Sequence, residues 1–179
     1  MNPDFIEALA NWGPFLAAVA GVAATLVGLL FVALGLNPRI MGDNGPAGLR
    51  VWAGQTFHSF FSLLLISLAG LVPSSGGEAI TITLGIVGVQ GIIRIAADVW
   101  RVRNDPDPHW RGGHALYRFI SPVIAYITIL WMTYGTWRRD PDVLGWFIMV
   151  VFLLMISALA SCWELLKAVG EQAKGDSGA

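Results

Sequence analysis

The sequence predicts an all-α membrane protein, a bundle of five transmembrane helices with its N-terminus outside and its C-terminus in the cytoplasm. Composition is the first reason for this fold class. Of the 179 residues, 55% are hydrophobic and 13% are charged, and the mean hydropathy is +0.64. Soluble domains carry about 25% charged residues, so a chain of this length cannot hide so much apolar surface from water. Long charge-free runs and the distribution of the cations are the other two reasons.

Charge-free runs show where the chain can cross a bilayer, which takes about 20 apolar residues. Four runs are long enough. A fifth, residues 79–93, has only 15 residues before Arg94, and its continuation to Trp100 includes Asp98. The four long runs are Ala8–Pro38, Val51–Gly77, Phe119–Trp137 and Val143–Trp163.

The distribution of Lys and Arg favours counting the short run as a fifth span. With five spans, seven Lys and Arg residues fall on one face and only Arg138 and Arg139 on the other. Without the short span the split is nearly even. Cytoplasmic loops are enriched in Lys and Arg, so the face with seven cations, which includes the C-terminus, is predicted to be cytoplasmic. The seven are Arg39, Arg50, Arg101, Arg103, Arg111, Lys167 and Lys174.

Turn-forming residues bound the spans. Pro38 ends the first helix because proline lacks the backbone N–H that a helix interior needs. Residues 73–77 and 140–142 form short outer turns, and Asp142 is expected to cap the last helix. Residues 1–179 are therefore predicted to be one transmembrane domain, with spans at about 12–36, 51–72, 79–100, 116–137 and 143–166 and a frayed tail at 170–179.

Polar side chains from four of these spans are predicted to lie at one depth, in the cytoplasmic half of the bundle. Residues three or four positions apart share a helix face, as do His58 and Ser62 in the second span and Arg94 and Asp98 in the third. A charge at the bilayer centre costs about 2.5–3.5 kcal/mol on insertion scales, so such residues usually face protein or water. The pattern predicts a polar site for an ion or small solute, formed by Gln55, His58, Ser62, Gln90, Arg94, Asp98, Arg118 and Glu164.

A purely structural interpretation stands beside this one. Arg94 can snorkel to the inner headgroups, with Asp98 as its partner one turn away. His58 suits a proton relay or a pH gate because histidine changes charge near neutral pH. It can equally be a neutral imidazole that is hydrogen-bonded to Gln90 or to a serine. The sequence leaves these alternatives open.

Small residues form two stripes that let helices approach closely. Gly21 and Gly28 lie on one stripe of the first span, and Gly85, Gly88 and Gly91 lie on the third. These stripes predict either packing within the bundle or contact with a second copy or another membrane protein. The lipid bilayer is the other expected partner.

Several function classes have no support in the sequence. The net charge of −1 gives no general electrostatic case for nucleic-acid binding. No phosphate-binding glycine loop, nucleophile elbow or HExxH motif occurs, so no enzyme activity and no cofactor are predicted. The single cysteine, Cys162, cannot form an intramolecular disulfide. The segment Asp105–His114 holds two Asp and two His but matches no known ligand spacing, so no metal site is predicted.

The run from Gly28 to Asn37, GLLFVALGLN, resembles a stretch of small, largely uncharacterised bacterial inner-membrane proteins with a Gly/Ala-rich first helix. In these, the first helix has a similar Leu-Phe-Val-Ala-x-x-x-Asn ending, and a second helix closes with Leu-Val-Pro, as Leu71–Pro73 does here. The resemblance covers roughly the first 75 residues of the chain. It implies a bacterial inner membrane. Some members are labelled modulators of a membrane AAA+ protease, which implies a regulatory role.

Two functional hypotheses follow. The first is an oligomeric channel or transport-type protein for an ion or small polar solute, with its polar site in the cytoplasmic half. The alternative is a non-catalytic accessory or regulatory subunit that binds other membrane proteins through its Gly/Ala helix faces. The outer half of the bundle has few polar groups for a complete path, and a path between subunits is an alternative to one within a single chain.

Overall fold

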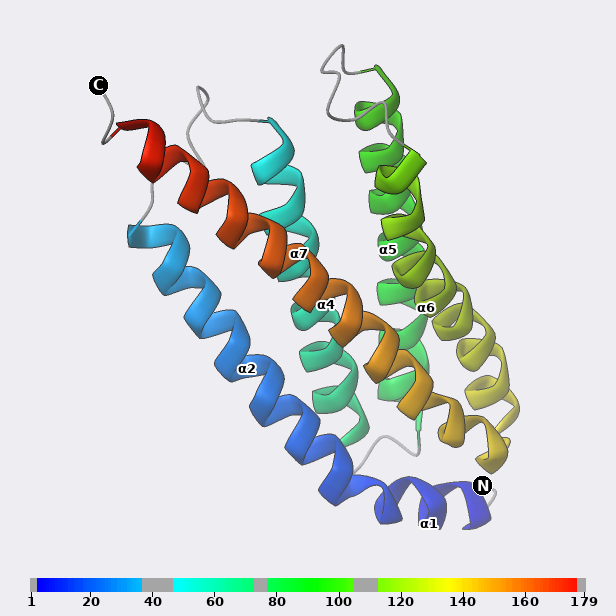
Figure 1. The fold of residues 1–179 in the computed structure, drawn as a ribbon. Helices are drawn as coiled ribbons and strands as arrows, with labels where there is room; N and C mark the ends of the chain where they lie inside the picture. The colour runs from blue at the N-terminus through cyan, green and yellow to red at the C-terminus, as the bar shows by residue number, and fades with distance from the viewer. Residues whose placement is uncertain (1–2, 37–46, 73–76, 105–112, 177–179) are drawn as a thin grey trace.

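A computed structural model of the chain describes residues 3–36, 47–72, 77–104 and 113–176, and these are helical apart from short turns (Figure 1). The predicted all-α class is confirmed, because no strand occurs in these ranges. The helices are α1 Pro3–Asn11, α2 Gly13–Leu36, α4 Ala47–Gly70, α5 Glu78–Asn104, α6 Gly113–Arg138, the 3-10 helix η2 Pro141–Gly145, and α7 Trp146–Asp176.

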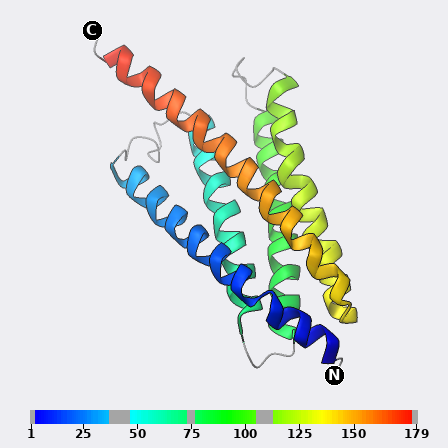
Figure 2. The same ribbon diagram turned by 60° about the horizontal axis from the view of Figure 1, so that its bottom comes forward.

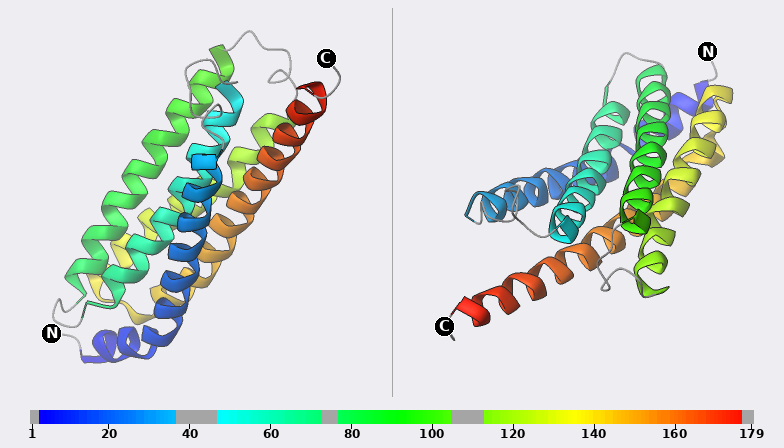
Figure 3. Two further views of the ribbon diagram at one scale, coloured as in Figure 1. Left: turned by 90° about the vertical axis from the view of Figure 1, so that its left-hand side faces the viewer. Right: turned by 90° about the horizontal axis from the view of Figure 1, so that it is seen from above.

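The five long helices run alternately up and down, so that consecutive helices are antiparallel (Figures 1 and 2). The centre of the bundle is α4, which packs against α2, α5 and α7. Helix α6 packs against both α5 and α7. At one end of the bundle α1 turns across the helix ends and contacts η2, whereas the C-terminus of α7 lies at the opposite end (Figure 3).

In the described part of the chain, three helical segments are long and apolar enough to cross a membrane: Gly13–Leu36, Glu78–Trp100 and Pro141–Trp163. They coincide with the first, third and fifth predicted spans. Long helices, α4 and α6, also cover the other two predicted spans, but among the described residues neither reaches the hydropathy of the three segments above. In α4 the difference comes from Gln55, His58 and several serines, which are the residues that give this helix its polar face.

The end of the bundle near α1 has an apolar core. Side chains from all the long helices meet there, and the largest of them are fully buried. The core is built from the beginnings of α2, α5 and α7 and the ends of α4 and α6, because those ends lie together in this up-and-down arrangement. It includes Leu16, Leu63, Ile66, Leu84, Met132 and Val150.

The outer surface of the bundle is also apolar. Each long helix exposes large hydrophobic side chains, such as Leu29, Phe61, Ile86, Ile127 and Phe152, of which 38–62% of the surface is accessible. A single soluble chain rarely exposes large contiguous apolar patches. A hydrophobic surface on all sides is typical of a bundle that has lipid as its solvent.

The turn between α6 and α7 differs from its prediction. The capping residue is Asp140 and not Asp142: its Oδ1 accepts a hydrogen bond from the backbone N of Asp142 at 3.1 Å. The reason is that Pro141 takes the first helical position, which proline favours, so the cap is the residue before it. Moreover, the helix that Asp140 caps is η2, which precedes α7.

Candidate functional site

The buried polar residues of α4 lie in the half of the bundle away from α1. Gln55, His58, Ser59 and Ser62 occupy one side of the helix, and each is no more than 9% exposed. Since α4 is the central helix, this side is covered by neighbouring helices. The four residues therefore form a polar layer inside the bundle, above its apolar core.

Hydrogen bonds connect this polar layer to two other helices. The amide Nε2 of Gln55 donates to the hydroxyl of Ser157 on α7 at 3.3 Å. The hydroxyls of Ser62 and Tyr126, which belongs to α6, are also 3.3 Å apart. Buried polar groups normally find such partners, because each buried group without one lowers the stability of the fold by about 1–3 kcal/mol. These contacts hold the three helices at fixed positions around the layer.

His58 lies in the middle of the layer and is 8% exposed. Its ring faces that of Tyr126, with centroids 5.8 Å apart and the planes tilted by 36°. Its Nε2 is buried and has no hydrogen-bond partner in the described part of the chain. The imidazole is therefore not held through Nε2 by Gln90 or by a serine, which was one of the two alternatives for this residue.

Arg94 reaches the same site from α5. A Cβ built on Gly54 would lie 2.5 Å from Nη2 of Arg94, so the guanidinium group rests on α4 where only glycine leaves room for it. Gly54 and His58 are one turn apart on the same face of α4. The guanidinium thus lies about one helical turn from the imidazole, at the edge of the site, because Arg94 is an exposed residue.

The structure brings together some of the predicted site residues and separates one of them. Gln55, His58 and Ser62 are buried together, Arg94 contacts the same helix, and Asp98 is 4% exposed one turn further along α5. Gln90 is exposed and does not join this group. The side chains of Arg118 and Glu164 lie outside the described residues, as does the segment 105–112 with its Asp and His residues.

Sequence reasoning missed Tyr126, which is 1% exposed and lies at the centre of the site. A tyrosine in the interior of a span is unusual, because Tyr and Trp are enriched at the two membrane interfaces. A buried tyrosine hydroxyl usually has a hydrogen-bond partner. The position of Tyr126 in the middle of its helix was therefore the feature of the sequence that could have indicated a buried polar site.

The glycine stripe of α5 is used within the chain. A Cβ on Gly88 would lie 2.7 Å from Cδ2 of Leu130, and one on Gly91 would overlap with the ring of Tyr126. Gly85 faces the same helix, α6, at ordinary contact distance. Of the two alternatives for this stripe, packing within the bundle is the one that the structure contains.

The glycines of α2 have no such role. Gly21 and Gly28 are exposed, and a Cβ on either would meet no described atom within 4 Å. Of the four glycines predicted to contact a partner, Gly21 and Gly28 are thus the two on an open surface.

The site combines an unpartnered imidazole nitrogen, a guanidinium group and several hydroxyls. The imidazole can accept or donate a proton, and the guanidinium can bind an anion or a carbonyl oxygen. No family model, curated protein or solved structure matches the chain. The resemblance of its N-terminal part to bacterial inner-membrane proteins stays a prediction, and the geometry alone carries the functional argument.

Proposed function

We propose that the chain is a multi-pass protein of a bacterial inner membrane, in which α2, α4, α5, α6 and α7 each cross the bilayer. Three apolar helical segments of sufficient length and the hydrophobic outer surface support membrane insertion. The distribution of Lys and Arg supports an outside N-terminus and a cytoplasmic C-terminus. In this orientation the polar layer lies in the cytoplasmic half and α1 lies at the outer surface.

Within this frame, the chain is a channel or transport-type protein for an ion or small polar solute, and it acts as an oligomer. One observation carries the proposal: among the residues that the structure describes, none partners the buried Nε2 of His58, which lies near the guanidinium of Arg94. A polar group that is left unpaired in a membrane interior is costly, so its retention favours a role in binding. The missing partner is then a solute, an ion or a transferred proton.

The apolar core limits how a solute could pass. Most of the buried side chains that the structure describes between the polar layer and α1 are apolar, with Ser67 and Thr136 as buried polar exceptions, so they form no continuous polar route through that half. Transport then requires that the helices open on the other side, as in alternating access. A route between subunits is the other possibility that this core allows.

Flux through proteoliposomes tests the proposal. We expect purified wild-type protein to dissipate a gradient of at least one probe among protons, K⁺, Cl⁻ and glycerol. Arg94→Gln and His58→Leu should each lower that flux by about tenfold or more. A tenfold change corresponds to roughly 1.4 kcal/mol, which is about what one lost hydrogen bond to the solute contributes. Gln90→Ala is the matched control, because Gln90 lies one turn from Arg94 on α5 but outside the site.

Circular dichroism would show that each variant keeps its helical content, so that lost flux is not lost folding. Equal flux in wild-type protein, Arg94→Gln and His58→Leu would contradict the assigned site. A wild-type protein that conducts none of the four probes would instead favour the alternative function.

That alternative is a non-catalytic accessory or regulatory subunit, and the open face of α2 favours it. Gly21 and Gly28 leave a shallow surface on which another transmembrane helix can pack closely. A single membrane partner that co-purifies with the wild type, and is lost in Gly21→Leu and Gly28→Leu, would support this function. Retention of the partner in both variants would exclude this face as its binding site.

A further inference from the structure

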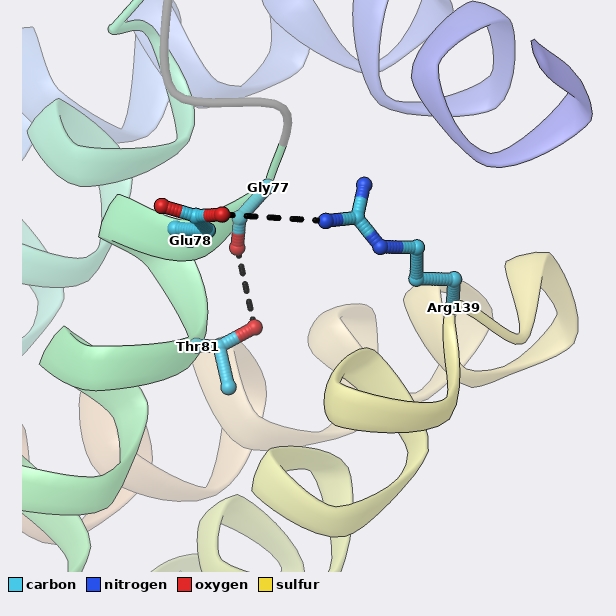
Figure 4. Close-up of polar contacts among 4 residues, drawn as sticks. All are labelled: Gly77, Glu78, Thr81 and Arg139. Atoms are coloured by element: carbon cyan, nitrogen blue, oxygen red, sulfur yellow. Dashed lines mark hydrogen bonds and ion pairs between the residues drawn. The ribbon is translucent and has the colours of Figure 1, made fainter. Parts of the chain in front are cut away.

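A pocket of about 300 Å³ lies at the end of the bundle opposite the polar layer. It is bounded by the first turns of α5 and the last turn of α6 (Figure 4). Sites for small molecules begin at about this volume. Its lining joins two opposite charges, Glu78 and Arg139, to the hydroxyl of Thr81 and to the apolar side chains of Ile82 and Trp137.

The two charges face each other across the pocket without a tight contact. Nη2 of Arg139 and Oε1 of Glu78 are 3.9 Å apart, at the outer limit for an ion pair, and the glutamate side chain is 77% exposed. Thr81 uses its hydroxyl to donate to the carbonyl of Gly77 at 2.9 Å. The arginine side chain is 28% exposed. Because the contact between Arg139 and Glu78 is long and the glutamate is largely in solvent, it contributes little stability, and a ligand with both charges can replace it.

Arg139 occupies a backbone position that favours glycine. Its φ is +57°, and the backbone N of Asp140 donates to the carbonyl of Gly135 at 3.1 Å. This is the Schellman ending of α6, in which the left-handed residue is usually glycine because other residues are strained there. The turn would be more stable with glycine, so Arg139 places its side chain at the pocket from a strained backbone position.

The pocket has the position of a headgroup site if the helices cross a membrane as proposed. Glu78 begins one apolar segment, and Arg139 comes two residues before another, which begins at Pro141. Beside the charges, Ile82 and Trp137 are 62% and 79% exposed on the outer surface of the bundle. Charged groups therefore lie at the helix ends, and apolar side chains continue from them toward the bilayer centre. This order matches a phospholipid, in which a charged headgroup is followed by apolar acyl chains.

We propose that this pocket binds the headgroup of a zwitterionic phospholipid with a primary amine, that is, a phosphatidylethanolamine. Its phosphate accepts hydrogen bonds from Arg139, and its ammonium group donates to Glu78. Its acyl chains lie along Ile82 and Trp137. This inference rests on the proposed membrane insertion but not on the His58 site, so transport and lipid binding can fail separately.

The paired charges select among lipids by simple electrostatics. A phosphatidylglycerol headgroup is anionic: its two hydroxyls can donate to Glu78, but it has no cation to pair with the carboxylate, which repels its net negative charge. A phosphatidylcholine headgroup has both charges, but its quaternary ammonium cannot donate a hydrogen bond. We expect the three lipids to bind in the order phosphatidylethanolamine, phosphatidylcholine, phosphatidylglycerol.

The test uses the full chain, delipidated in detergent, with the three lipids carrying identical acyl chains. Native mass spectrometry counts the lipid that is retained, and thermal unfolding records the shift that each lipid causes. Arg139→Gly should weaken retention of phosphatidylethanolamine by about tenfold or more. Without lipid, the same variant should melt about 2–4 °C higher than wild type, because the strained residue is replaced by glycine.

A variant that is more stable yet binds less lipid cannot be explained by misfolding. Arg138→Gln is the matched control: it also removes a cation, but Arg138 lies over the ring of Tyr134, 4.5 Å from its centroid, and does not line the pocket. Glu78→Gln provides a second variant, in which the preference for phosphatidylethanolamine over phosphatidylglycerol should fall.

Three results would overturn the proposal. The first is equal retention of the three lipids by wild-type protein, and the second is unchanged binding in Arg139→Gly. The third is a thermal shift of the same size with free O-phosphoethanolamine, because the pocket would then be a site for a soluble zwitterion and not for a lipid.

Discussion

Replacing Gly91 with leucine should prevent α5 from packing against α6. A Cβ at this position would overlap with three atoms of the Tyr126 ring. The ring is 1% exposed and is enclosed by neighbouring helices, so it cannot move aside. We expect a destabilisation of more than about 3 kcal/mol, the upper end of the usual cost of overpacking a core. The measurement is thermal unfolding in detergent, together with elution as a single species.

Gly28→Leu is the matched control for this substitution. It also places leucine at a glycine within a long helix, but at a position where no described atom lies within 4 Å. Its melting temperature should stay near that of the wild type. Equal stability of Gly28→Leu and Gly91→Leu would show that α5 and α6 do not approach each other as the structure has them.

Tyr126→Ala should have the second large effect. This tyrosine is among the largest fully buried side chains, and it contacts Gly91 on α5, His58 and Ser62 on α4. Truncating a buried aromatic residue to alanine costs about 3–5 kcal/mol. Tyr126→Phe keeps the ring and removes only the hydroxyl, so it should cost about 0.5–1.5 kcal/mol.

Thermal unfolding of the two variants side by side separates packing from hydrogen bonding. If Tyr126→Phe were as destabilised as Tyr126→Ala, the hydroxyl rather than the ring would hold the helices together. The double variant Gly91→Leu/Tyr126→Ala provides a further check, because the leucine can occupy the space that the ring leaves. The double variant should be destabilised by less than the sum of the two single destabilisations, as expected for residues in direct contact.

Local patterns were sufficient to predict the helices. Each long helix covers one of the expected spans, and the observed ends differ from the expected ones by a few residues, except that α7 continues well past its span to Asp176. Runs of apolar residues and turn-forming prolines act over short stretches of chain, so they can be recognised without knowing what packs where. The end of the bundle at which a polar residue lies follows from the same patterns, since it is set by the position of the residue along its helix.

Which side chains meet could not be predicted in the same way. Gln90 and Arg94 share a predicted face, yet only Arg94 contacts α4, and it does so because Gly54 leaves room for its guanidinium group. The cap is Asp140 and not the predicted Asp142 because Pro141 occupies the first helical position of η2, a short helix that hydropathy does not reveal. Tyr126 was overlooked because a hydropathy pattern treats a tyrosine in an apolar run as one more hydrophobic residue.

The sequence by itself determined that the chain is helical, where its long helices lie, and that its polar residues cluster toward one end of them. Only the tertiary structure decided that His58, Ser62 and Tyr126 share a buried site, that the glycines of α5 pack against α6, and that Arg139 reaches Glu78. The physical reason is that local hydropathy and turn-forming residues fix where a helix begins and ends. Its rotation about its own axis is fixed by close packing against neighbours that are distant in sequence.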